Sequence, residues 1–221
     1  DMLPEVHEQS QDVDYALEQL EEGGWTVTSA GALEKDGETY ELRYDVYQPY
    51  AEWVTTAHVM ADQWSETLGL SVSVNQMADA PFTEASSIGN FGMLSYYPFS
   101  GNMPYDLFAT MSDLHYTPID EQAIWNYGRF QNEEYDELVH ELGSIPAGED
   151  IERSHELIVR IQEILTDEAP FIATATAGWK LVANEQNWTG FPTVEGGFDY
   201  APNAPMPADG ILTLMNLQPK D

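Results

Sequence analysis

The side chains of this chain that could do chemistry are, first of all, its carboxylates. Asp and Glu number 39 against 7 Lys and Arg, which gives a formal net charge of −32. Two carboxylates at a fixed separation, one of them with a raised pKa, can hydrolyse a glycosidic bond. With so many carboxylates present, neighbours such as Glu133 and Glu134 arise throughout the sequence. Their proximity along the chain therefore identifies no active site.

Other catalytic and metal-binding patterns are missing from the sequence. There is no cysteine, and so no thiolate nucleophile and no disulfide. There is no G-x-S-x-G elbow, phosphate-binding loop, dinucleotide-binding glycine pattern or H-E-x-x-H motif. The histidines lack the spacing of metal ligands; they are His7, His58, His115, His140 and His155. We therefore expect no enzyme, no cofactor and no metal site.

A group of aromatic residues could bind a molecule without reacting with it. They lie at the end of an expected strand over 91–97 and in the loop after it, and are Tyr96, Tyr97, Phe99, Tyr105 and Phe108. In open α/β sheets, ligands bind outside the carboxyl ends of the strands. Aromatic faces with a few hydrogen-bonding tips line such clefts. The same rings would equally pack this segment onto its own domain, and the sequence leaves both interpretations open.

The elements that must position these residues follow from apolar periodicity. Apolar residues at three- and four-residue spacing predict helices over 14–22, 50–68, 82–88, 133–142 and 150–167. Alternation and short apolar runs predict strands over 39–46, from 70 onward, and over 91–97, 171–175, 180–184 and 211–217. Strand–helix–strand order with short connections favours a parallel crossover. We predict an α/β fold with a mixed, partly parallel sheet flanked by helices.

Residues 98–130 differ from the rest of the chain. They contain several prolines and glycines among many aromatic residues, and only a short helix is predicted near 106–111. A long irregular segment inside a compact domain usually carries function. Ligand-binding residues are therefore expected in this stretch.

The charge balance excludes one class of partner and favours one kind of environment. Nucleic-acid binding is excluded because phosphate contacts need clustered Lys and Arg, and this field repels a polyanion. The acidic residues are spread along the whole chain, which argues against a single site for a basic partner. In molar salt the Debye length shrinks to about 3 Å, so surface carboxylates repel each other little. We therefore predict a protein from a halophilic organism.

Four segments match, in order, the sequence pattern of one family. They are Tyr15–Trp25, close to "A-x-x-L-L-x-E-A-G-W", Leu68–Val72, close to "L-x-x-I-G-I-x-V", Asn132–Leu138, close to "N-P-E-Y-D-x-L", and Glu163–Pro170, close to "x-I-L-x-E-x-A-P". Together they span most of the chain. In these segments the chain resembles the second large lobe of the family-5 extracellular solute-binding proteins, the dipeptide, oligopeptide and nickel-binding group.

The resemblance implies a type II periplasmic-binding-protein architecture, in which two α/β lobes close on a solute. Residues 1–187 would form the C-terminal large lobe, and 188–221 would cross toward the missing N-terminal lobe of the same protein. The implied function is the solute-binding component of an ABC importer. Its partners would be a peptide or small-molecule ligand and the transporter permease. The implied location is extracellular, at the cell surface, with the signal and the membrane anchor outside this chain.

The resemblance also places the ligand contacts. They are expected at Tyr96, Tyr97, Phe99, Asn102, Met103, Tyr105, Asp106, Tyr127 and Arg129. In peptide-binding members an Asp-Pro pair holds the peptide ammonium, whereas this chain has Met103-Pro104. A thioether cannot pair with an ammonium ion, so Asp106 is the candidate substitute. Arg129 would hold a carboxylate or take part in a surface ion pair.

Two alternatives stay open at this point. A halophilic hydrolase that uses two carboxylates would show turnover and an acid that titrates near neutral pH. An acidic cell-surface domain would bind no small ligand at all. A binding protein would instead show saturable binding without turnover.

Overall fold

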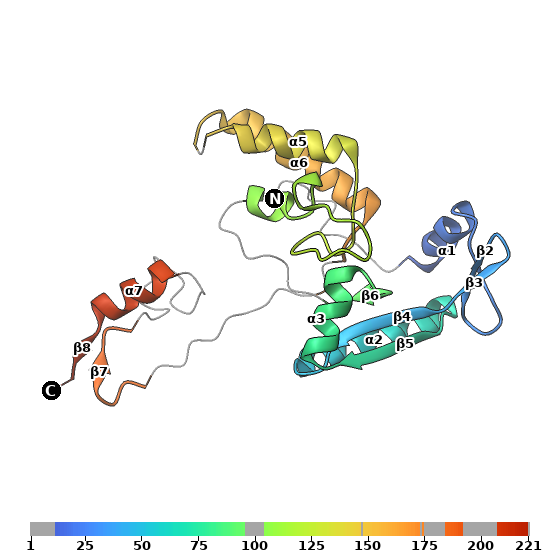
Figure 1. The fold of residues 1–221 in the computed structure, drawn as a ribbon, viewed down its shortest axis with the longest axis horizontal. Helices are drawn as coiled ribbons and strands as arrows, with labels where there is room; N and C mark the ends of the chain where they lie inside the picture. Colours follow the sequence, from blue (N-terminus) through green and yellow to red (C-terminus); the bar gives the residue numbers. More distant parts are fainter. Residues whose placement is uncertain are drawn as a thin grey trace. The chain divides into compact units, whose positions relative to one another are not determined.

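The computed structural model describes residues 12–95, 104–146, 148–172, 174, 184–191 and 207–220. The chain divides into two compact units, Asp1–Phe171 and Ile172–Asp221, and each is described by itself (Figure 1).

The first unit contains a parallel sheet in the order β5-β4-β6. Its strands are β4 (Leu42–Tyr47), β5 (Val72–Met77) and β6 (Met93–Leu94), and β4 pairs in parallel with both neighbours. Helix α2 (Ala51–Leu68) joins β4 to β5, and α3 (Asp79–Ile88) joins β5 to β6. The two crossovers step in opposite directions, so right-handed connections place the two helices on opposite faces. The predicted α/β fold with a partly parallel sheet and flanking helices is confirmed.

The central strand β4 is buried on both faces. On one face Tyr44 and Val46 pack against Ala57 of α2 and form the apolar core of the sheet. On the other face the carboxylate of Asp45 is fully buried. A buried carboxylate is costly unless it is hydrogen-bonded. This one accepts hydrogen bonds from donors in β4, in β5 and just before β6.

The partners of Asp45 come from both sides of β4. Its Oδ1 accepts from Nδ2 of Asn75 in β5 at 2.7 Å. Its Oδ2 accepts from Nε of Arg43 at 2.8 Å and from the backbone N–H of Gly92, just before β6, at 3.2 Å. Strand β6 is only two residues long and so forms few backbone hydrogen bonds with β4. The bond from Gly92 to the side chain of Asp45 adds one more link between the two segments.

Helices make up the other half of the first unit. These are α4 (Pro104–Ala109), α5 (Glu133–Ser144) and α6 (Ile151–Glu168), with a short 3-10 helix at Asp113–His115. Their common core consists of Phe108, Ala109, Tyr135, Val139, Leu142, Leu157, Ile161 and Ile164. The side chains of Asn132 and Asp150 cap the first turns of α5 and α6. The predicted helices over 133–142 and 150–167 are therefore confirmed, each within two residues.

Arginines of α6 tie it to α5 on the outer surface. Each binds one glutamate of each helix, at 2.7 to 3.0 Å: Arg153 with Glu141 and Glu156, and Arg160 with Glu134 and Glu163. The two arginines are seven residues apart, so the same bridge repeats two turns along the helix.

The start of the first unit is a helix and a small antiparallel sheet. Helix α1 (Val13–Glu22) is followed by β1 (Thr26–Val27), β2 (Leu33–Lys35) and β3 (Glu38–Tyr40). The predicted single strand over 39–46 is wrong, because β3 belongs to this sheet and β4 to the parallel one. Asp36 and Gly37 both have positive φ, 55° and 82°, as a two-residue hairpin turn requires.

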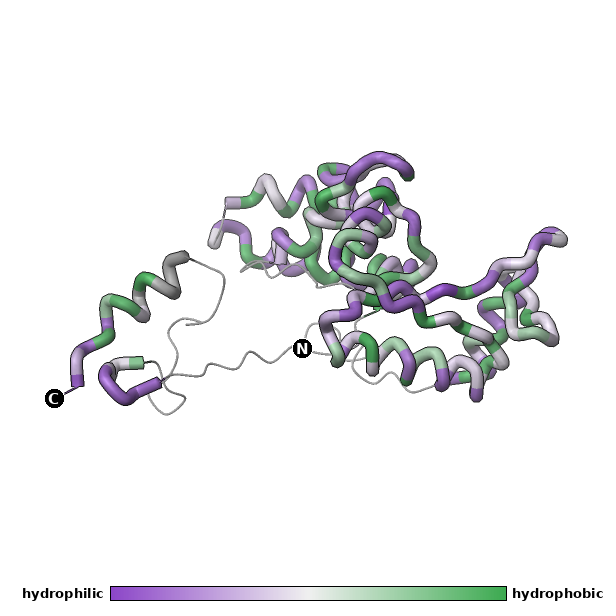
Figure 2. Tube along the Cα trace, turned by 60° about the horizontal axis from the view of Figure 1, so that its bottom comes forward, coloured by the Kyte–Doolittle hydropathy of each residue, from purple (hydrophilic) through white to green (hydrophobic). Residues whose placement is uncertain are grey.

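The second unit pairs β7 (Trp188–Thr189) with β8 (Gln218–Pro219), and α7 (Pro207–Asn216) precedes β8. The predicted strand over 211–217 is wrong, because 211–216 are helical. These seven residues include five apolar ones, and so short a segment has no period that separates strand from helix. Exposed apolar side chains of α7 are Ile211, Leu214 and Met215, and the green stretches of this helix in Figure 2 show the same character.

Other sequence predictions fall partly outside the described residues. Phe171 and Ile172 are not in a strand, and the rest of the predicted strands over 171–175 and 180–184 lies mostly outside the described part, as does the end of the strand over 91–97. The predicted boundary between 187 and 188 stays a prediction. Among the helices that the structure describes, none combines the length and apolar character needed to cross a bilayer.

Candidate functional site

The structure describes part of the ligand-binding set expected from the sequence. Tyr96, Tyr97, Phe99, Asn102 and Met103 lie outside the described residues. Tyr105, Asp106, Tyr127 and Arg129 lie within them.

Tyr105 and Asp106 both lie in the first turns of α4. The half-buried ring of Tyr105 packs against the helical core. It lies so close to Gly143 of α5 that a Cβ there would come within 2.6 Å of the ring. Phe108, the other described ring of the expected aromatic group, is 4% exposed in the same core. These two rings therefore pack onto their own unit, while Asp106 is half-buried beside them.

Arg129 holds a loop against the end of α3. Its Nη2 donates to the carbonyls of Ser87 at 2.8 Å and Glu121 at 3.1 Å, and its Nη1 donates to the carbonyl of Tyr127 at 3.0 Å. Carbonyls in the last turn of a helix lack intrahelical partners and carry the negative end of its dipole. The guanidinium of Arg129 thus donates to backbone carbonyl oxygens, one of which belongs to Tyr127.

Backbone bonds reinforce this clamp. The N–H of Asp120 donates to Ile88 at 2.9 Å, and that of Ala123 donates to Ser87 at 2.8 Å. The backbone of Arg129 itself has a positive φ of 56°, which is unfavourable for a residue with a side chain. The strained loop is held in place by its contacts with α3, and it links the sheet half to the helical half.

An aromatic cluster that sequence reasoning missed lies at the carboxyl end of β4. We call it the ring cluster: Tyr47, Tyr50, Trp53 and Phe82. Tyr47 meets Tyr50 with ring centroids 5.0 Å apart, and Phe82 with centroids 5.3 Å apart. Tyr50 meets Trp53 at 4.8 Å, edge to face. The rings come from the end of β4 and the starts of α2 and α3, so they lie at the edge where open α/β sheets bind ligands.

One carboxylate borders the ring cluster. The hydroxyl of Tyr47 donates to Oδ1 of Asp79 at 3.1 Å. Burial, together with the hydrogen bond and the charge of Asp79, raises the pKa of Tyr47. Asp79 lies in the first turn of α3, where the helix dipole favours a negative charge. The sequence signal was the three-residue spacing Tyr47, Tyr50, Trp53 directly after a strand.

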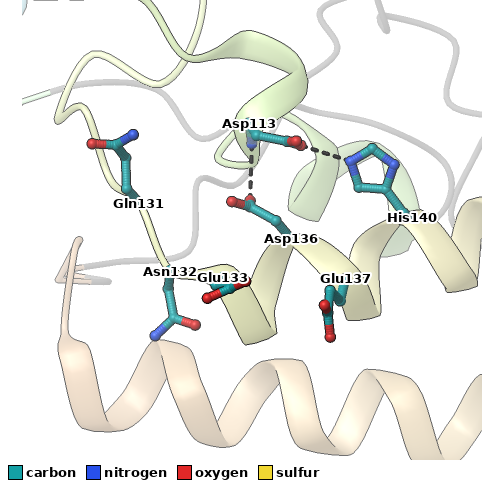
Figure 3. A pocket seen from close by; sticks show the side chains of 7 residues that line it. All are labelled: Asp113, Gln131, Asn132, Glu133, Asp136, Glu137 and His140. Carbon is teal, nitrogen blue, oxygen red and sulfur yellow. Dashed lines mark hydrogen bonds and ion pairs between the residues drawn. The ribbon is translucent and has the colours of Figure 1, made fainter.

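A second candidate is an acidic pocket at the start of α5 (Figure 3). It is lined by Asp113, Gln131, Asn132, Glu133, Asp136, Glu137 and His140. Oδ1 of Asp113 lies 2.7 Å from Nε2 of His140, and the backbone N–H of Asp113 donates to Asp136 at 2.9 Å. Burial raises the pKa of Asp136, and the charge of Asp113 raises it further.

The chemistry of this pocket is limited by its residue types. Of the described residues that line it, none is a serine, threonine or cysteine, so it offers no nucleophile of those kinds. In the part of the chain that the structure describes, no group of three or more His, Cys, Asp or Glu side chains is placed to hold a metal ion. Four carboxylates line the pocket; that of Asp113 lies against His140, and that of Asp136 accepts from the backbone amide of Asp113.

Several solved structures share this fold. The oligopeptide-binding protein of an ABC transporter from Thermotoga maritima, solved with bound mannohexaose, superposes with a TM-score of 0.77 at 21% identity. The match covers 96% of this chain and 40% of that protein. The oligopeptide-binding protein AppA from Bacillus subtilis, in complex with a nonapeptide, has a TM-score of 0.57 at 20% identity, covering 73% of this chain and 31% of that one.

A nickel-binding relative in fold shows the same likeness. NikZ from Campylobacter jejuni, in complex with Ni(L-His), has a TM-score of 0.58 at 16% identity. The match covers 73% of this chain and 31% of NikZ. No protein-family model and no curated protein matches this chain. The chain thus has the fold of one domain of periplasmic-binding-protein-like structures, and it spans 40% of the Thermotoga protein.

Proposed function

We propose that this chain is one lobe of a solute-binding protein that serves an ABC importer. The solute, a peptide or another small molecule, would be enclosed between the carboxyl edge of the parallel sheet and a second lobe outside this chain. The observation that carries the proposal is the ring cluster at that edge, in a fold shared with the Thermotoga binding protein over 96% of this chain. Rings at strand ends are typical of ligand clefts.

The proposed site combines two groups of residues. The ring cluster would form one wall. The expected contacts Tyr96, Tyr97, Phe99, Asn102, Met103 and Asp106 would form another, because they follow β6 in the same sheet. Tyr105, Tyr127 and Arg129 would position these segments, since their described contacts are to the helical core and to α3.

Two solute classes are favoured among small molecules. The Thermotoga protein holds mannohexaose and AppA holds a nonapeptide. Aromatic faces pack against sugar rings and against apolar peptide side chains alike. We propose an oligosaccharide or a peptide bound without a salt bridge at position 103.

We also propose that the protein works outside the cell, in high salt, and presents the bound solute to a permease. The described basic side chains support the high-salt part. Arg43, Arg153 and Arg160 bind carboxylates, Arg129 binds carbonyls, Lys35 lies over the ring of Trp25, and Lys220 donates to the carbonyl of Glu185. The outward charge is therefore nearly all carboxylate, which is tolerated when salt screens it.

The second unit would cross toward the missing lobe, as the resemblance implies for residues 188–221. Support comes from α7, whose Leu214 and Met215 are 70% and 75% exposed. Several exposed apolar side chains gathered on one helix mark a candidate surface for a partner.

Calorimetry of the full-length protein in molar KCl tests the proposal. The panel would hold short peptides, manno-oligosaccharides and nickel with histidine. We expect saturable binding of one class, and recovery of the solute unchanged by chromatography. Tyr50→Leu in the ring cluster should weaken this binding about tenfold, whereas Tyr15→Leu on α1, 58% exposed, should leave it unchanged.

The acidic pocket gives a second candidate function, a carboxylate-dependent hydrolase. The raised pKa of Asp136 favours it, since one acid of such a pair must hold its proton. This function predicts turnover that Asp136→Asn abolishes. Conversion of any panel member to products would contradict the binding proposal, and no binding to any member would favour an acidic surface domain.

A further inference from the structure

We propose that Asp79 and the ring cluster form a subsite for a small organic cation, such as a quaternary ammonium group, at the carboxyl edge of the parallel sheet. The inference rests on the proposed function and names the chemistry of one part of that site.

The first step is the geometry of the carboxylate. Asp79 is exposed at the start of α3, and Tyr47 holds its Oδ1 by the hydroxyl hydrogen bond of 3.1 Å. Among the described residues, no hydrogen bond to Oδ2 is formed. The carboxylate is therefore oriented by one ring of the cluster and keeps an oxygen for a ligand.

The second step is the character of the rings beside it. Tyr47, Tyr50 and Trp53 are half-buried and meet edge to face. The face of an aromatic ring carries negative charge density, which attracts a cation placed over it. The Asp79 carboxylate, hydrogen-bonded to the Tyr47 ring of this cluster, thus places a negative charge beside an apolar wall. A quaternary ammonium group, with methyl groups around its charge, matches both.

The third step excludes other ligands for this position. A bare metal ion needs several ligand side chains, and no such group occurs among the described residues. An anion is repelled by Asp79 and by the net charge of −32. The arginine of β4, Arg43, is bound to the buried Asp45 and to the carbonyl of Asn90. The carboxyl edge of the sheet beside Asp79 therefore favours an organic cation as its ligand.

The test is a titration of the full 221-residue chain with choline, followed by NMR of the Trp53 indole and the tyrosine rings. Potassium chloride keeps the ionic strength constant. The comparison ligand is the uncharged isostere of choline, in which carbon replaces the quaternary nitrogen. We expect choline to shift the Trp53 signal in a saturable way, and the isostere to bind at least about tenfold more weakly.

Matched variants locate the effect. Asp79→Asn keeps the acceptor for the Tyr47 hydroxyl and removes the charge, so choline affinity should fall about tenfold. Asp79→Glu keeps the charge and should retain more affinity than Asp79→Asn. The control is Asp62→Asn, which removes one exposed carboxylate from the middle of α2 and should leave the affinity unchanged. Circular dichroism of each variant checks the fold.

Three results would overturn the inference. Equal losses in Asp79→Asn and Asp62→Asn would mean that only the overall charge attracts choline. Equal binding of the isostere would mean that the rings bind apolar groups without regard to charge. If choline fails to bind while calorimetry finds a neutral solute whose affinity depends on Tyr50, this inference is wrong and the proposed function stands.

Discussion

The two halves of the first unit are stabilised in different ways. The helical half, residues 104–168, buries a continuous apolar core and leaves its ion pairs at the surface. The sheet half, residues 42–95, has a smaller buried apolar cluster, with a carboxylate buried in its central strand and rings half-exposed at its edge. Polar groups and rings placed where they limit stability are typical of functional regions. We infer that stability comes mainly from the helices and, under the proposed function, that the sheet carries recognition.

The largest expected effect is in the helical core. Ile161 is fully buried, so Ile161→Ala should lower the free energy of unfolding by about 4 kcal/mol. Ile151→Ala, at a side chain of the same helix that is 73% exposed, should cost less than about 0.5 kcal/mol. Denaturant titrations measure both. Choline affinity of the folded protein should stay unchanged, and a loss of affinity would break the proposed division of roles.

The next effect is at the buried carboxylate of the sheet. Asp45→Ala removes the acceptor of three hydrogen bonds, from Asn75, Gly92 and Arg43. We expect a loss of about 3 kcal/mol in the free energy of unfolding. Because Asp45 ties β5 and β6 to β4, solute affinity should fall as well. A variant with normal affinity would show that the carboxyl edge does not depend on this tie.

A smaller change in the free energy of unfolding is expected at Tyr135, whose hydroxyl donates to the carbonyl of Phe108 at 2.8 Å. Tyr135→Phe should cost about 1 kcal/mol. Burial raises the pKa of Tyr135 well above its usual range. The folded state thus keeps a proton that the unfolded chain releases near pH 10, so this contribution is full below about pH 10 and is lost as the pH rises further.

Thermal melts over a series of alkaline buffers measure this effect. The Tyr135→Phe variant should lose less stability above about pH 10 than the wild type does. Tyr15→Phe, an exposed control on α1, should leave the free energy of unfolding at neutral pH unchanged. Parallel curves for Tyr135→Phe and the wild type would contradict the prediction.

The smallest effect is at the surface bridges of α6. Arg160→Gln removes the ion pairs to Glu134 and Glu163. In molar salt the melting temperature should change by less than about 2 °C, because exposed pairs are screened. The hydrogen bond from Arg160 lowers the pKa of Glu134. The contribution of the Glu134–Arg160 pair to the free energy of unfolding is therefore present above the ordinary glutamate pKa of about 4.3. It is lost as the pH falls below that value. Melts at low salt, above and below that pH, measure the difference.

Much of the fold could be predicted from the sequence because its helices are strongly periodic. The stripe of apolar residues in α6 and the glycine after α2 fixed both elements to within two residues. The strand over 39–46 failed because alternation continues across Glu41 while the chain changes sheets. The run 211–217 failed because five apolar residues fit a helix face or a strand.

The candidate site was harder to predict because its parts are far apart in the sequence. Tyr47 and Phe82 are brought together only when the β4–α2–β5 crossover places the starts of two helices at one edge. Arg129 was expected to contact the ligand because the family resemblance places it in the cleft and its charge suits a carboxylate. Its carbonyl partners become apparent only when the loop packs on the end of α3, and backbone acceptors leave no mark in a sequence.

The internal contacts of the basic side chains have a practical consequence for engineering. Each arginine of this chain already serves an internal contact, so a variant intended for ordinary laboratory buffers should keep all of them. Lysines could instead replace exposed glutamates that no arginine contacts, such as Glu18, Glu66 and Glu152. Each exchange raises the net charge by two units and introduces attraction where dilute buffer leaves only repulsion. Under the proposed function in high salt, such a variant should fold at a lower salt concentration than the wild type, with its sheet edge unchanged.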